Sequence, residues 1–72
     1  MRTRYDGEED TLDLVIKDGQ IHHALEQDQV IINYAENGDV IEIEILNASK
    51  FLGEFLTRII QAKPKAKLIE IG

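Results

Sequence analysis

Three acidic residues near the start of the chain have the spacing of the first ligands in a calcium-binding loop. Asp6, Glu8 and Asp10 lie two residues apart, as the first carboxylates of an EF-hand loop do. However, Thr11 occupies the position that requires glycine, and Lys17 occupies the position of the bidentate glutamate. We therefore expect an acidic surface turn here and no metal.

The two histidines, His22 and His23, are adjacent. Neighbouring residues on a β-strand point to opposite faces, so we do not expect this pair to bind one ion within a chain. The absence of cysteine excludes a disulfide, a thiolate zinc site and a cysteine nucleophile. The spacing gives Ser49 no general base, and its better role is to cap a helix. We therefore predict no catalytic, cofactor-binding or metal-binding residues, and no enzyme activity.

Acidic residues also gather in the middle of the chain. Glu42 and Glu44 alternate on a predicted strand and so share one face, about 7 Å apart, with Glu36 and Asp39 nearby. A pair of carboxylates can hydrolyse glycosides, but a chain this small has no enclosing cleft that would raise the pKa of one of them. We expect a solvated acidic face instead.

The segments that carry these residues are predicted to be strands. Alternating or β-branched runs indicate strands at residues 1–5, 11–16, 30–34 and 40–45, and residues 21–26 could form a further short strand. Asn37-Gly38 is the preferred pair for a two-residue type I′ turn. That turn sets three cross-strand pairs on one apolar face: Tyr34 with Ile41, Ile32 with Ile43, and Val30 with Ile45.

A helix is predicted to follow. Asn47 or Ser49 would cap its start, and Pro64 would end it. Its large apolar residues cover about half of the circumference. They are Phe51, Leu52, Phe55, Leu56, Ile59 and Ile60. Residues 65–71 could form a last edge strand, or a tail that becomes ordered only against a partner.

These elements predict one α+β domain over residues 1–72, because 72 residues leave no room for two cores. The expected fold is a four- to five-stranded antiparallel β-meander (residues 1–46) with one C-terminal amphipathic helix (residues 47–62) packed on one face. A basic and apolar tail (residues 63–72) follows. Phe51, Leu52 and Phe55 are expected to complete the core of the monomer.

The remaining apolar residues near the C-terminus are predicted to form an interface. A chain of this length barely buries enough apolar area to offset its conformational entropy, and an unpaired apolar cluster would aggregate. We therefore expect a homo-oligomer, with a dimer favoured. The interface candidates are Leu56, Ile59, Ile60, Leu68, Ile69 and Ile71.

Charge is distributed unevenly along the chain, whose net charge is −6. Residues 1–57 hold thirteen acidic and four basic residues, hence −9, whereas residues 58–72 hold four basic residues and one acidic residue, hence +3. The acidic body repels phosphate, so we expect no nucleic-acid partner. The chain has no apolar run of the ~20 residues that cross a membrane and no signal-peptide pattern, and with no cysteine we expect a cytoplasmic protein.

Several of these segments together resemble a known family. Arg4-Tyr5-Asp6, Glu9-Asp10-Thr11-Leu12, Tyr34 with Asn37-Gly38, and Ile43-Glu44-Ile45-Leu46-Asn47-Ala48-Ser49 are similar to the domain of unknown function 2283 family over about residues 2–52. The resemblance implies a small β-meander with a following helix and no assigned activity. The helix and tail after Phe51 are longer and more apolar than the usual end of that family.

Two functions remain open at this point. The first is a non-enzymatic protein-interaction domain that self-associates through the helix and the C-terminal segment. The second is an antitoxin-like partner, which the resemblance implies because similar proteins lie beside small toxin-like proteins. In that role the acidic face would neutralise a small basic protein by charge complementarity. The acidic-face candidates are Glu36, Asp39, Glu42 and Glu44.

Overall fold

The computed structural model describes residues 1–62 and 67–72, and contains one antiparallel sheet and one helix. This confirms the predicted α+β class. The strands are β1 (Arg2–Asp6), β2 (Thr11–Val15), β3 (His23–Gln27), β4 (Val30–Tyr34) and β5 (Val40–Ile45), and the helix is α1 (Ala48–Gln61). The further strand that the sequence left open at residues 21–26 is therefore present as β3.

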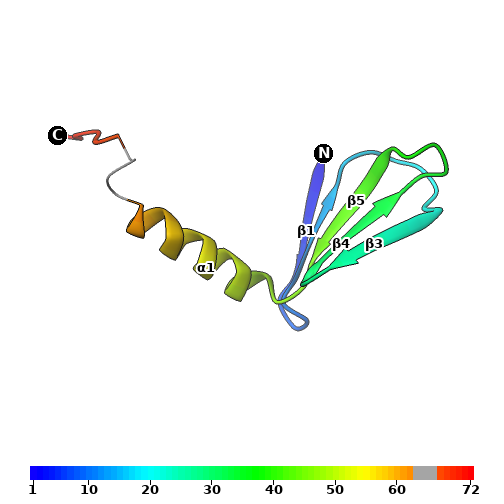
Figure 1. The fold of residues 1–72 in the computed structure, drawn as a ribbon, viewed down its shortest axis with the longest axis horizontal. Coiled ribbons are helices and arrows are strands. Elements are labelled where there is room, and N and C mark those ends of the chain that lie inside the picture. Colours follow the sequence, from blue (N-terminus) through cyan, green and yellow to red (C-terminus); the bar gives the residue numbers. More distant parts are fainter. Residues whose placement is uncertain (63–66) are drawn as a thin grey trace.

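The sheet combines a hairpin with a three-stranded meander. Its strand order is β1-β2-β5-β4-β3, so the last strand of the meander pairs with the second strand of the hairpin (Figure 1). β2 and β5 are far apart in sequence, and their pairing places Leu14 opposite Ile43 and Asp13 opposite Glu44. This pairing joins the two halves of the chain into one layer.

The turn between β4 and β5 differs from the predicted type I′ turn. Ala35 N–H donates to the Asp39 carbonyl at 2.8 Å, and Gly38 N–H donates to the Ala35 carbonyl at 3.0 Å, which makes a longer loop. Gly38 has φ 91°, whereas Asn37 is not among the residues with positive φ. One left-handed position, occupied by glycine, is what a type I turn with a following bulge requires.

A β-bulge restores the predicted register beyond this turn. Tyr34 pairs with Val40 and not with Ile41, so that prediction was wrong. The register then shifts by one residue between Asn33 and Tyr34, and Ile32 pairs with Ile43 and Val30 with Ile45 as predicted. At the bulge the Ile41 carbonyl accepts hydrogen bonds from two backbone N–H groups, at residues 16 and 17. Alternation in the strands therefore fixed the register more strongly than the turn sequence did.

The helix does not pack on the face of the sheet. It leaves the end of β5 and projects away from the sheet (Figure 1). Ala48 is buried, but every residue of α1 after it is exposed. Phe51, Leu52 and Phe55, which were expected to complete the monomer core, are 36%, 54% and 49% exposed. The expectation of a packed helix was wrong because the periodicity of a helix marks its apolar face but not the surface that covers it.

The C-terminal segment is only partly described. The two alternatives for residues 65–71 fall in part on residues 65 and 66, which lie outside the described residues. Residues 67–72 form neither helix nor strand and are exposed.

Candidate interaction surface

One face of the sheet is apolar and has no second layer over it. The cross-strand pairs put the same-face residues into two rows, one through Leu14, Ile43 and Ile32, and one through Leu12, Ile45 and Val30. All six side chains are only half-buried. Within residues 1–62 and 67–72, Ile41 is the one strand hydrophobic residue that is buried. We call the six residues of these rows the apolar sheet face.

The interface candidates of the helix are exposed on one side of α1. Leu56, Ile59 and Ile60 are 48%, 51% and 62% exposed. Their spacing, together with that of Phe51, Leu52 and Phe55, gives one continuous stripe, which we call the helix stripe. The tail candidates Leu68, Ile69 and Ile71 are exposed as well. None of these residues is buried by another described part of the chain.

The junction between the sheet and α1 is fixed by a residue from a distant turn. Asp10, between β1 and β2, accepts hydrogen bonds from the Ser49 backbone N–H at 3.1 Å and from the Ser49 hydroxyl at 2.6 Å. Its carbonyl also accepts from the Ala48 N–H at 2.8 Å. The Tyr5 hydroxyl donates to the same carboxylate at 2.7 Å. The carboxylate of Asp10 therefore caps α1 in place of the predicted Asn47 or Ser49 side chains.

These hydrogen bonds shift two ionisation equilibria. Donation by Ser49, and then by Tyr5, holds the pKa of Asp10 below its ordinary value of 3.8. The hydrogen bond to Asp10 in turn raises the pKa of Tyr5 above 10.0. The first shift favours the ionised carboxylate at the start of the helix, where an anion is also stabilised by the helix dipole. The second shift favours the protonated Tyr5 hydroxyl that donates to this carboxylate.

A second residue holds the junction from the other side. The Gln29 side-chain amide donates to the Leu46 carbonyl at 2.6 Å and to the Asn47 carbonyl at 3.2 Å. The Leu46 N–H donates back to the Gln29 carbonyl at 2.8 Å. Asn47 itself is left-handed, with φ 51°, which turns the chain from β5 into α1. The direction in which α1 leaves the sheet is therefore set by hydrogen bonds on both flanks, from Asp10 on one side and Gln29 on the other.

Two clefts lie between the first turns of α1 and the sheet. One, of about 370 Å³, is lined mainly by apolar groups, among them Leu12, Ile45 and Phe51. The other, of about 570 Å³, lies between the β3–β4 side of the sheet and the helix, and Ile32 and Phe51 are part of its wall. Both clefts open where the apolar sheet face and α1 diverge.

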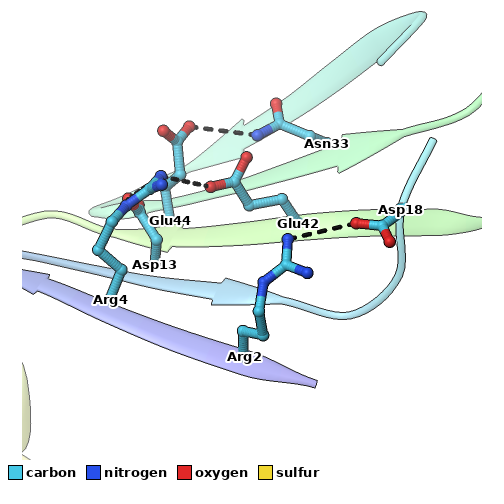
Figure 2. Close-up of polar contacts among 7 residues, drawn as sticks. All are labelled: Arg2, Arg4, Asp13, Asp18, Asn33, Glu42 and Glu44. Atoms are coloured by element: carbon cyan, nitrogen blue, oxygen red, sulfur yellow. Dashed lines mark hydrogen bonds and ion pairs between the residues drawn. The ribbon is translucent and has the colours of Figure 1, made fainter. Parts of the chain in front are cut away.

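The opposite face of the sheet carries a compact polar cluster (Figure 2). Arg4 donates to Asp13 at 2.9 Å and lies 3.5 Å from Glu42. The buried Asn33 amide donates to Glu44 at 3.3 Å. The hydrogen bond and the charge of Asp13 raise the pKa of Arg4 above its ordinary value. The arginine therefore serves as the counter-ion of a carboxylate cluster drawn from different strands.

The cluster contains three carboxylates, of which the sequence predicted that only Glu42 and Glu44 lie together. Carboxylate oxygens of Asp13, Glu42 and Glu44 all lie within 4.8 Å of one another. Asp13 was missed because its position beside Glu44 depends on the pairing of β2 with β5. The guanidinium of Arg4 already supplies a positive charge to the cluster. An acidic group of this kind is common on protein surfaces and does not by itself indicate a metal site.

The four acidic-face candidates lie on two parts of the structure, β5 and the turn that precedes it. Glu42 and Glu44 belong to the polar cluster, and the side chain of Glu42 is only 16% exposed. Asp39 lies in the β4–β5 turn, where the ammonium of Lys17 and the amide of Asn37 hydrogen bond to it and lower its pKa. Glu36 is exposed in the same turn. Two of the four are thus on the sheet and two are in a loop.

The rings of His22 and His23 lie closer together than expected for neighbouring residues on one β-strand. His22 precedes β3, so the rule of opposite faces does not apply to it, and its Nδ1 lies 3.0 Å from the Nδ1 of His23. The His23 ring stacks on Tyr34 with a centroid distance of 5.1 Å. The predicted separation of these two rings was therefore wrong. Both residues are exposed.

α1 is fourteen residues long. Within the described residues, the structure contains no helix that is long and apolar enough to cross a bilayer.

Comparison with known proteins finds relatives without an assigned role. Residues 2–49 match the model of a family described as "Protein of unknown function (DUF2283)". An uncharacterized protein of Methanocaldococcus jannaschii is 53% identical over 47 residues, which are 64% of this chain and 40% of the relative. The chain thus spans less than half the length of that relative. No solved structure matches it. The family match covers all five strands but ends at the start of α1.

Proposed function

We propose a function for this chain, which belongs to the DUF2283 family of proteins of unknown function. The proposed function is that of a non-enzymatic protein-interaction domain. In this proposal it self-associates through its helix and its C-terminal segment. The observation that carries the proposal is the helix stripe, whose six large apolar residues are between 36% and 62% exposed. Exposed apolar surface of this extent typically marks a contact with another molecule.

The shape of the chain supports the same proposal. A compact domain of 72 residues has a radius of gyration of about 11 Å, whereas this chain has 15.9 Å. The difference comes from a helix that projects without support from its own sheet. Isolated helices of about this length are marginal in water, because most helical stability comes from packing of the apolar side. A partner surface would supply that packing.

A pair of matched variants tests the proposal by mass in solution. Ile59→Glu places a charge in the helix stripe, and Thr57→Glu places the same charge on the polar side of the same helix. The two variants are matched because each replaces a β-branched residue with glutamate. By sedimentation velocity we expect twice the 8.2 kDa chain mass for the wild type and for Thr57→Glu. We expect Ile59→Glu to weaken self-association at least tenfold. Ile71→Glu tests the tail in the same way.

Three outcomes would contradict the proposal or one part of it. A wild-type mass of 8.2 kDa at every concentration would remove self-association. Equal masses for the Ile59→Glu and wild-type chains, both above 8.2 kDa, would remove the helix from the interface. An Ile71→Glu chain that associates like the wild type would exclude the tail alone.

Charge supports a second candidate function, an antitoxin-like partner of a small basic protein. Residues 1–57 carry a net charge of −9, which would attract a cationic surface. The division of the four acidic candidates between the sheet and a loop means that such a partner would contact the acidic body broadly. Titration calorimetry with a small basic protein encoded beside this chain tests the idea. Binding that weakens with added salt supports it, and no binding at low salt rejects it.

A further inference from the structure

We propose that α1 of a second copy covers the apolar sheet face, so that two chains exchange their helices. This inference rests on the proposed self-association and adds which two surfaces meet. Each chain offers one uncovered apolar sheet face and one uncovered helix stripe. A symmetric pair matches each sheet with the partner's helix and leaves neither surface unpaired, as a closed dimer requires.

The junction explains why a chain does not cover its own sheet. For α1 to fold back, the chain would have to rotate at residues 46–49. That rotation would break the hydrogen bonds from Ser49 and Ala48 to Asp10, and those between Gln29 and Leu46. Within a dimer the helix can reach a sheet without breaking any of these bonds. The open angle between α1 and its own sheet, where the two clefts lie, is then the space that the partner's helix enters.

The dimensions of the two surfaces agree. The fourteen residues of α1 form a helix about 21 Å long at a rise of about 1.5 Å per residue. Five strands at a spacing of about 4.8 Å make a sheet roughly 19 Å wide. One helix therefore spans the whole apolar sheet face, with its wide stripe against the sheet.

The exposed area of the chain also fits an obligate dimer. A compact monomer of 8.2 kDa exposes about 4,500 Å², whereas this chain exposes 6104 Å². The excess is roughly 1,600 Å² per chain. A specific interface buries about 800 Å² per partner, and obligate dimers bury more. Helix exchange would remove area of this size and give the sheet its missing second layer.

Charge favours a second copy as the occupant. The segment that starts at Arg58 carries +3, whereas residues 1–57 carry −9. In an exchanged dimer the basic end of each chain lies near the acidic body of the other. The same arrangement would keep like charges apart, because the two acidic polar clusters face outward on opposite sides.

An isotope-filtered NOE experiment on the wild-type chain tests the arrangement directly. One half of the sample is labelled with ¹³C and ¹⁵N, the other half is unlabelled, and only contacts between the two kinds of chain are recorded. We expect intermolecular contacts between methyl groups of the helix stripe, such as Leu56 and Ile59, and methyl groups of the apolar sheet face, such as Leu14, Ile32 and Ile43.

The outcomes separate this inference from the proposed function. A dimeric mass with intermolecular contacts only between helices, or only between sheets, overturns helix exchange but leaves self-association standing. Helix-to-sheet contacts found only within one chain also overturn it. A monomeric mass at every concentration overturns both. Intermolecular contacts between the helix stripe and the apolar sheet face support both.

Discussion

Asp10 connects three parts of the chain that are separate in sequence. Its carboxylate accepts hydrogen bonds from Tyr5 in β1 and from Ser49 in α1, and its carbonyl accepts from Ala48. The residue is left-handed, with φ 53°, a conformation that Asp and Asn tolerate better than most residues. It follows that the N-terminal hairpin decides where the helix starts.

This role predicts a pH-dependent effect of Asp10→Asn. The variant keeps a side chain that accepts the left-handed conformation but loses the carboxylate. Since the folded state lowers the pKa of Asp10 below 3.8, ionised Asp10 stabilises the fold fully above that value, and this stabilisation is lost as the pH falls through the lowered pKa. We therefore expect the variant to melt a few degrees below the wild type at neutral pH, and we expect this gap to shrink as the pH falls toward 2.

Thermal unfolding followed by circular dichroism at the two pH values measures this difference. Asp18→Asn is the control, because its ion pair with Arg2 is exposed and contributes little. A gap between the wild type and Asp10→Asn that is the same at both pH values would show that the charge of the carboxylate is not involved.

At the scale of elements, the conformation of the β4–β5 turn predicts how a substitution of Gly38 changes stability. Gly38 has φ 91° and nothing near its Cα that a side chain would strike, so its conformation alone sets the effect of a substitution. Gly38→Ala is expected to lower the free energy of unfolding by about 1 kcal/mol, since left-handed backbone costs an L-residue roughly that much. Glu36→Ala, in the same loop without positive φ, is the control. Urea unfolding compares them, and equal effects would refute the assignment of the turn.

The strands were predictable because their signal is local. Alternation at Leu12 and Leu14, and again at Ile43 and Ile45, placed the apolar sides correctly, and the long apolar period placed the helix. The pairing of β2 with β5 was not predictable in this way, because it depends on contacts between distant segments. For that reason the carboxylates of the polar cluster were anticipated only at Glu42 and Glu44, without Asp13.

The direction of the helix was unpredictable for a different physical reason. The apolar side of α1 requires cover, but its sequence pattern is the same whether its own sheet or a partner's sheet provides that cover. The answer depends on the junction, where Asp10 and Gln29 fix the exit of the chain from β5. Asn47 and Ser49 correctly marked where the helix begins, but the group that caps it is the carboxylate of Asp10, 39 residues before Ser49.

At the scale of the whole molecule, the chain is a single layer with a projecting arm. It measures 48 × 27 × 24 Å. Among the described residues, just two hydrophobic side chains, Ile41 and Ala48, are buried. A sheet with one uncovered apolar side has little hydrophobic stabilisation of its own, because folding gains free energy from apolar area removed from water. The stability of such a chain should therefore depend on assembly.

That dependence predicts a melting temperature that rises with concentration. If the folded state is a dimer and the unfolded state is a monomer, a hundredfold increase in concentration adds about 2.7 kcal/mol of stability per dimer. For two chains of this length the melting temperature should then rise by roughly 10 °C. Scanning calorimetry at two concentrations measures the rise, and Thr57→Glu should reproduce it. A melting temperature that does not change with concentration would mean that one chain alone holds the fold, so that the helix stripe and the apolar sheet face contribute nothing to stability through a partner.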